Sequence, residues 1–248
     1  MDLWQRTDLE ALKTARTRLT YLFLDDGDVL NDNRVRAGEW RRLIGEFMPP
    51  RMGGTAEQWE SANRVVFPQV WPSLLARLSD FASHHAFQRT YAMDWMTAMC
   101  DAVGVTRLPD DRAVELHTEL SVYVNARANS AIAGAADAVH ALHRAGYTLY
   151  TASGTTSWEL RAILEHMGIA DLFSGIYGPD LVDHVKHGSI FYRKMFEDAG
   201  VAPSQALVID SDATCCRWAS EVGANAVWID ADGRGDATTL EKLAQALV

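Results

Sequence analysis

Apolar runs of strand length alternate with amphipathic patterns over the second half of the chain, from about residue 130 onward. The runs predict strands at 147–150, 175–177, 206–209 and 226–229. The patterns between and around them predict helices at 134–145, 157–167, 190–199, 214–222 and 238–247. Strands that alternate with helices are typical of a doubly wound parallel sheet with both faces covered. The sequence therefore predicts an α/β fold, similar to a Rossmann fold.

One further strand is predicted near the start of the chain. Four apolar residues, Tyr21–Leu24, run directly into Asp25, Asp26, Gly27 and Asp28. Ligands of open α/β sheets bind outside the carboxyl ends of the strands, so these carboxylates are placed for chemistry. The alternative is a strand that ends in an acidic surface turn. An amphipathic helix is expected before this strand, at residues 2–19.

The segment between the first and second strands lacks strand alternation and predicts only helices. We expect them at 34–47, from Thr55 onward, and at 73–84, 87–103 and 110–126. Thr55 and Gln58 have the spacing of a capping box, and Pro68 and Pro72 predict a helix boundary. The segment holds enough aromatic residues for a small core of its own. The chain is therefore divided into an α/β core domain, 1–33 with 131–248, and an inserted all-helical cap domain, 34–130.

The composition of the chain limits the classes of partner that it is expected to bind. The net charge of −10 disfavours a general nucleic-acid binder, which needs lysine and arginine to neutralise phosphates. Three cysteines are too few for a disulfide framework. Charged residues interrupt the N-terminal segment, and no apolar run reaches the ~20 residues of a membrane span. We expect a cytoplasmic protein without a membrane partner, whose N-terminal helix and tryptophan-rich cap offer surfaces for a homodimer.

Polar residues follow several of the predicted strands. Asp25 follows the first and Thr151 the second, while Asp210 and Asp212 follow a later one and Lys186 lies in a loop before a helix. In a parallel sheet these ends meet at one crevice. A carboxylate nucleophile, a hydroxyl, a cation and further carboxylates are the groups that metal-assisted phosphoryl transfer requires.

These residues, in this order, resemble the four motifs of the haloacid dehalogenase superfamily of hydrolases. The first motif matches the run from Leu24 to Leu30, with Asp25 as nucleophile, in the Asp-x-Gly-x-Val version of the motif. The second matches Thr151, and the third matches Lys186 with the aromatic pair Phe191-Tyr192. The fourth matches Val208 to Asp212. The match spans nearly the whole chain, and the helical insertion resembles the type 1 cap of the family.

The resemblance implies a role for each of these residues. Asp25 would attack phosphorus and form an aspartyl-phosphate, while Thr151 and Lys186 would bind the phosphoryl oxygens. Ser153 and Gly154, in the same turn as Thr151, are expected to bind the substrate. Mg²⁺ would be held by Asp25, the backbone carbonyl of Gly27, and Asp210. A hard cation prefers such oxygen ligands.

The sequence departs from the family pattern at two positions. Gly27 stands where the usual general acid would be, and Asp28 is a candidate to replace it. A frame shifted by one residue would make Asp26 the nucleophile and Asp28 the acid, with Leu30 where Thr or Val belongs. Ser211 stands where the family often has a second metal-site acid, for which Asp212 is a candidate substitute.

The leading interpretation is a hydrolase, namely a magnesium-dependent phosphatase of a small phosphorylated metabolite. The first alternative is a metal-independent dehalogenase in which Asp25 attacks carbon. That subgroup usually has an aromatic residue two positions after the nucleophile, where this chain has Gly27. The second alternative is a catalytically impaired binding protein that retained the fold.

Overall fold

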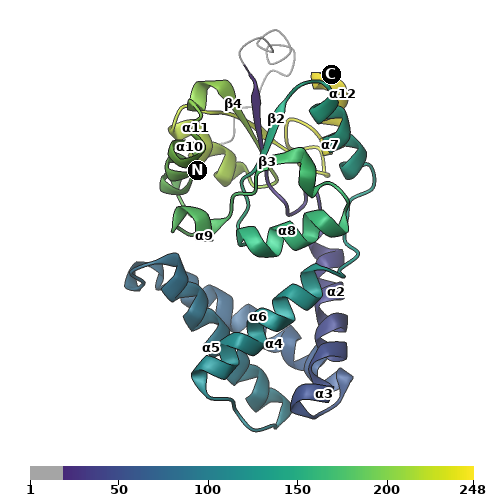
Figure 1. Ribbon diagram of the computed structural model, residues 1–248, viewed down its shortest axis with the longest axis vertical. Coiled ribbons are helices and arrows are strands. Elements are labelled where there is room, and N and C mark those ends of the chain that lie inside the picture. The colour runs from purple at the N-terminus through teal and green to yellow at the C-terminus, as the bar shows by residue number, and fades with distance from the viewer. Residues whose placement is uncertain (1–18) are drawn as a thin grey trace. The chain divides into compact units, whose positions relative to one another are not determined.

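The computed structural model describes residues 19–248 and contains a parallel five-stranded sheet (Figure 1). Its strands are β1 (Tyr21–Leu24), β2 (Thr148–Thr151), β3 (Phe173–Gly175), β4 (Ala206–Asp210) and β5 (Asn225–Trp228). They lie in the order β3-β2-β1-β4-β5, with β1 in the centre. The α/β prediction is thereby confirmed. The helix expected at residues 2–19 falls almost entirely outside the described residues.

Side chains of the central strand point alternately to two apolar cores. Leu22 and Leu24 belong to one core, and Phe23 belongs to the core on the opposite face. This period of two follows from the pleat, because successive side chains of a strand point to opposite faces. In β4 the same alternation divides Leu207 from Val208. Every strand end therefore presents consecutive residues to different faces.

Helices cover both faces of this sheet. In Figure 1, α7 (Ala135–Arg144) and α12 (Leu240–Leu247) lie on one side, and α10 (Ser189–Ala199) and α11 (Ala213–Glu221) on the other. The unit also contains α8 (Ser157–His166), the short helix α9 (Pro179–Val182) and the 3-10 turns η3 (Ala170–Leu172) and η4 (Pro203–Gln205). One expectation was wrong by two residues: the strand expected at 175–177 begins at Phe173, because the turn η3 ends directly before it.

The chain divides into two compact units, one formed by residues 1–33 with 130–248 and the other by Arg34–Asn129. The second is helical and begins within α2 (Asn33–Phe47). It continues through α3 (Pro49–Met52), α4 (Ala56–Leu75), η2 (Leu78–Asp80), α5 (His84–Val103) and α6 (Asp110–Asn125). None of its helices, nor any other helix among residues 19–248, is long and apolar enough to cross a membrane.

Two expectations about α4 have different outcomes. The capping box is confirmed, since the Gln58 N–H donates to Thr55 Oγ1 and the Thr55 N–H donates to Gln58 Oε1. The boundary at Pro68 and Pro72 is wrong, because α4 continues through both prolines to Leu75. Both prolines are exposed, so water can reach the carbonyls that their missing N–H groups leave unpaired. The separate helix expected at 73–84 is accordingly absent from this part of the chain.

The helical unit has its own core around Trp59 and Trp95, both buried. Trp95 Nε1 donates to Asn63 Oδ1 at 3.1 Å. Beside the apolar side chains of α6 lie three buried polar ones, His117, Ser121 and Asn125, which occupy one helix face at a spacing of four residues.

Candidate active site

The carboxyl ends of β1 and β4 place two acids side by side. Leu24 lies opposite Ile209 where β1 and β4 pair in parallel. The N–H of the next residue, Asp25, donates to the Ile209 carbonyl at 2.8 Å. Asp25 and Asp210 therefore occupy neighbouring positions and share the face of Phe23 and Val208. Both carboxylates are nearly inaccessible to solvent, with exposures of 9% and 1%.

A buried lysine joins the two carboxylates. Lys186 comes from the loop between α9 and α10, and its Nζ lies 2.7 Å from Asp25 Oδ1 and 2.8 Å from Asp210 Oδ2. Burial by itself would lower the pKa of Lys186, but the charges of Asp210 and Asp25 outweigh burial and raise it. The side chain is therefore an ammonium ion that compensates the two acids.

The pKa of Asp25 is raised far above that of an ordinary aspartate. Burial raises the pKa of Asp25 to about 7, and Lys186 opposes this shift while Asp210 and Asp26 add to it. Perturbed carboxylates of this kind are concentrated at functional sites. Any further cation bound here would favour the ionised form of Asp25.

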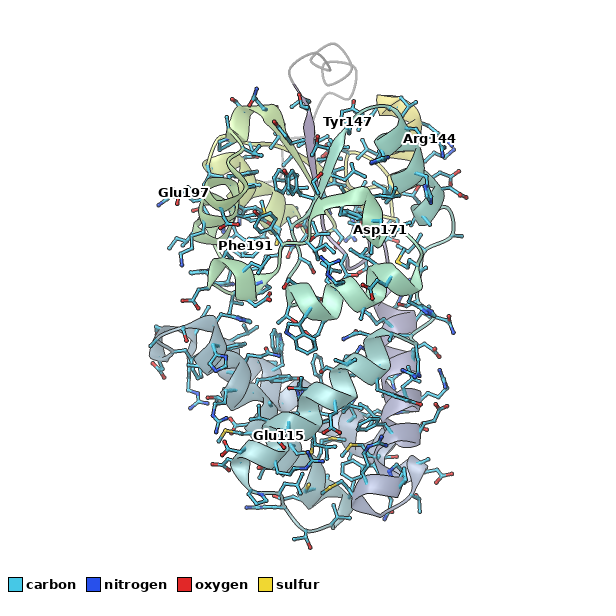
Figure 2. All side chains as sticks on the ribbon, in the orientation of Figure 1. Glu115, Arg144, Tyr147, Asp171, Phe191 and Glu197 are labelled. Carbon is cyan, nitrogen blue, oxygen red and sulfur yellow. The ribbon has the colours of Figure 1, made fainter. Side chains whose placement is uncertain are left out.

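A backbone N–H from the following loop and a tyrosine hydroxyl from α10 orient the Asp210 carboxylate. The Asp212 N–H donates to Asp210 Oδ1 at 2.9 Å, and the Tyr192 hydroxyl lies 3.4 Å from Asp210 Oδ2. Figure 2 shows how α10 divides its residues, with Phe191 in the interior and Glu197 pointing outward. The aromatic pair after Lys186 was the only signal in the sequence for the contact between Tyr192 and Asp210.

The three oxygen donors expected to hold Mg²⁺ lie at the same edge of the sheet. They are the carboxylates of Asp25 and Asp210 and the carbonyl of Gly27, which Ser211 Oγ fixes by donating to it at 2.8 Å. Among residues 19–248, no group of three or more His, Cys, Asp or Glu side chains could hold a metal. Mg²⁺ is commonly bound through one or two carboxylates plus substrate phosphate, so the donor set fits this ion.

The Asn33 side chain occupies the space beside Gly27, where the family usually has its general acid. A Cβ atom added at Gly27 would lie 2.7 Å from Asn33 Nδ2 and 2.9 Å from Asn33 Oδ1. An aspartate at this position would therefore require Asn33 to move. Asn33 in turn is bound to Asp28, whose two oxygens accept from the Asn33 N–H and Nδ2, both at 2.9 Å. Asp28 thus caps the start of α2.

The structure distinguishes the two possible frames of the first motif. Asp25 is the acid that contacts Lys186. The carboxylate of Asp26 turns to the other face, where it accepts from Asn31 Nδ2 at 2.9 Å and Thr155 Oγ1 at 3.2 Å. The geometry therefore favours Asp25 over Asp26 as the acid that faces the other site residues.

The residues expected from the second motif divide into two groups. Thr151 follows the alternation of Leu149 and so lies on the face opposite Asp25, where its hydroxyl donates to the Tyr177 carbonyl at 3.0 Å. The structure does not bring this hydroxyl to Asp25. Ser153 and Gly154 lie beyond the end of β2, and a Cβ added at Gly154 would be 4.0 Å from Lys186 Cβ. The loop of Ser153 is therefore the part of this motif that reaches the lysine.

A protein family matches more than half of the chain. The sequence profile of the haloacid dehalogenase-like hydrolases matches residues 53–214. The chain belongs to this family. No curated protein sequence matches the chain. As a haloacid dehalogenase-like hydrolase, it has the α/β sheet and the helical insertion of that fold.

Solved structures of several such hydrolases resemble the chain over most of its length. One is the putative hydrolase YfnB from Bacillus subtilis bound to magnesium, with 16% identity, a TM-score of 0.66, and coverage of 93% of this chain and 99% of YfnB. Another is a 2-haloacid dehalogenase from Pseudomonas syringae, with 17% identity, a TM-score of 0.63 and coverage of 92% and 98%. A third is CbbY from Rhodobacter sphaeroides in complex with phosphate, with 18% identity, a TM-score of 0.54 and coverage of 85% and 86%. At these identities the likeness establishes the shared fold.

Proposed function

We propose that this hydrolase is a magnesium-dependent phosphatase that acts on a small phosphorylated metabolite. The observation that carries the proposal is the pairing of Asp25 with Lys186 beside Asp210 at the carboxyl edge of the sheet. An anionic substrate would be repelled by two bare carboxylates, and the ammonium offsets that repulsion. Positioning and charge compensation are the main requirements of phosphoryl transfer.

In the proposed reaction, Asp25 is the nucleophile. One of its carboxylate oxygens bonds to phosphorus while the bond from phosphorus to the ester oxygen breaks, and the leaving alcohol takes up a proton. Water then attacks the phosphorus of the aspartyl-phosphate, which releases inorganic phosphate and restores the carboxylate. Bound Mg²⁺, held by Asp25, Asp210 and the Gly27 carbonyl, would neutralise charge on the phosphoryl oxygens.

We assign the hydroxyl contact with the phosphoryl group to Ser153 rather than Thr151. The Thr151 hydroxyl already donates to the Tyr177 carbonyl, on the face away from Asp25. Ser153 Oγ accepts from the Thr155 N–H at 3.0 Å, which orients the hydroxyl and leaves its own proton to donate. Lys186 and the backbone at Gly154 complete the phosphoryl site.

The inserted helical unit is proposed to act as a type 1 cap that selects the substrate. This role follows from its place in the chain, between β1 and β2, and from the family resemblance. Asp28 is bound to Asn33 and exposed, so it would have to leave Asn33 before it could protonate a leaving group. Substrates with good leaving groups should therefore react fastest.

A second candidate is hydrolysis of a haloacid without a metal. The position of Lys186 between both carboxylates favours it, because the ammonium already supplies a positive charge where a metal would otherwise be needed. Asp25 would attack carbon, halide would leave, and water would hydrolyse the resulting ester. Gly27 weighs against this candidate, since the dehalogenase subgroup usually has an aromatic residue there.

The test measures phosphate release from an aryl phosphate and a panel of sugar phosphates, with magnesium or with chelator. Halide release from 2-chloropropionate is measured in parallel. We expect phosphate release that requires magnesium and is abolished by Asp25→Asn, while Asp232→Asn, a matched change of an exposed acid, has no effect. Halide release that persists with chelator, without phosphate release, would instead establish the dehalogenase.

A further inference from the structure

A buried hydrogen-bond network begins at the residue directly after the proposed nucleophile. Asp26 Oδ1 accepts from Asn31 Nδ2 at 2.9 Å, and Asn31 Oδ1 accepts from Ser130 Oγ at 2.9 Å. On its other oxygen, Asp26 accepts from Thr155 Oγ1 at 3.2 Å. Asp26, Asn31 and Ser130 are 1%, 1% and 3% exposed. Solvent therefore does not compete for these hydrogen bonds.

The same residues are also joined through their backbones. The Asn31 N–H donates to the Asp26 carbonyl at 3.0 Å, and the Asp32 N–H donates to the Ser130 carbonyl at 2.8 Å. Asn31 and Ala131 form an antiparallel bridge. The network thus fixes the loop of the first motif against the segment that returns to the α/β unit.

This network connects three stretches of chain that must be aligned for the reaction. The first is the loop of Asp25 and Asp26, and the second is the loop of Ser153 and Thr155. The third is the pair of connections by which the chain leaves the α/β unit at Asn33 and re-enters it at Ser130. Asn31 lies at the centre, because its amide donates toward the first motif and accepts from the returning connection.

We propose that Asn31 is a positioning residue, which holds Asp25 and the Ser153 loop in register through Asp26. Asn31 donates to the carboxylate of Asp26, the residue that follows Asp25 in the chain, so its effect on Asp25 passes through the nucleophile loop. Misplacement of a reacting group by about 1 Å can lower a rate about 100-fold. This proposal rests on the proposed hydrolytic function of Asp25.

The kinetic test compares Asn31→Ala with Asn225→Ala. Asn225 is a suitable control because its Nδ2 also makes two hydrogen bonds, to the carbonyls of Ser204 and Ala206, at the start of β5 and far from the carboxyl edge. We expect Asn31→Ala to lower kcat for the aryl phosphate about 10- to 100-fold with KM changed by less than about threefold. Ser130→Ala, which removes only the last hydrogen bond, should give a smaller fall in kcat. A kcat for Asn31→Ala within about twofold of the control would overturn the proposal.

A second test does not depend on activity. Amide hydrogen exchange in Asn31→Ala should become faster by on the order of tenfold in both 130–132 and 153–157, although these segments are far from residue 31 in sequence. Exchange that is faster only in 26–32 would contradict the proposal even if the protein is a phosphatase. If the parent protein releases no phosphate, the proposed function fails and the exchange pattern alone decides the role of Asn31.

Discussion

The two units of the molecule bury polar groups in different ways. At the carboxyl edge of the sheet, Asp25, Asp210 and Lys186 are buried together and compensate one another. In the helical unit, α6 buries Ser121 and Asn125, and Ser121 Oγ and Asn125 Nδ2 are the buried side-chain atoms without a hydrogen-bond partner among the described residues. Unpaired buried polar atoms reduce stability, whereas mutually compensating charges create a reactive site.

Burial alone therefore does not identify a functional residue. In the cluster of Asp25, Asp210 and Lys186, each buried charge has a partner of opposite charge, and removal of the lysine leaves the two acids in an apolar environment without a cation. The buried polar side chains of α6 are neutral, so their effects should be smaller and should appear in stability rather than in turnover. Five substitutions test this contrast.

The largest effect should follow from Lys186→Met. This change leaves Asp25 and Asp210 buried without their cation, so the free energy of unfolding should fall by about 3–5 kcal/mol. Activity should be lost as well. The control is Lys194→Met, because the Lys194 ammonium donates to two neutral carbonyls, those of Val182 and Asp183. Equal stability of the two variants in denaturant unfolding would refute the compensation described here.

The helical unit should be sensitive to acid because of His117. Burial lowers the pKa of His117 from 6.5 to about 4, so the unfolded chain binds a proton at a pH where the folded chain does not. The contribution of His117 to the free energy of unfolding should be fully present above pH 6.5. It should fall by up to about 3 kcal/mol as the pH drops toward 4. His117→Gln should remove this part of the pH dependence, and the exposed His143→Gln should retain it. Identical acid curves for both variants would be inconsistent with a buried neutral imidazole.

A moderate effect is expected at Asp28, which is polar but exposed. Asp28→Ala removes the acceptor for the Asn33 N–H, and loss of such a cap lowers the free energy of unfolding by about 1 kcal/mol. Hydrolysis of an aryl phosphate should change by less than about twofold, because that leaving group needs no proton. A large loss of kcat with Asp28→Ala but not with Asp28→Asn would show that the side chain contributes to turnover through its hydrogen bonds.

The smallest effects should come from two serine substitutions with opposite signs. Ser121→Ala removes an unpaired hydroxyl and should leave stability unchanged or raise it by about 0.5 kcal/mol. Ser153→Ala leaves the Thr155 N–H without its acceptor and should lower stability by about 1 kcal/mol. Thermal unfolding of both variants provides the comparison, and a loss of stability with Ser121→Ala would show that its hydroxyl has a partner.

Much of the fold could be predicted from the sequence, because each strand and helix of the α/β unit is marked by the hydrophobic pattern of its own residues. β1 was predicted at Tyr21–Leu24 and was found there, since a four-residue apolar run bounded by acids has few other structures. The path of α4 through Pro68 and Pro72 could not be predicted, because it depends on which face of the helix is exposed. Periodicity does not give that face when the helix carries aromatic residues on several sides.

The site was predictable in its charged residues but not in its hydroxyls. Asp25, Lys186 and Asp210 come together because parallel strand ends meet at one edge. The direction of Thr151 depends on the pleat register against β1, and the sequence alone did not indicate it. The contact between Asn31 and Asp26 was also absent from the prediction, because nothing in the spacing distinguishes a buried asparagine from one in a loop.

The proposed reaction requires that the substrate covalently modifies Asp25. The most direct measurement is to stop turnover of an aryl phosphate with borohydride, which reduces an aspartyl-phosphate to homoserine, and to map the modified residue by mass spectrometry. We expect homoserine at position 25 in the parent protein, and none in Asp25→Asn. Homoserine at position 26, or phosphate release without any modified aspartate, would contradict Asp25 as the nucleophile.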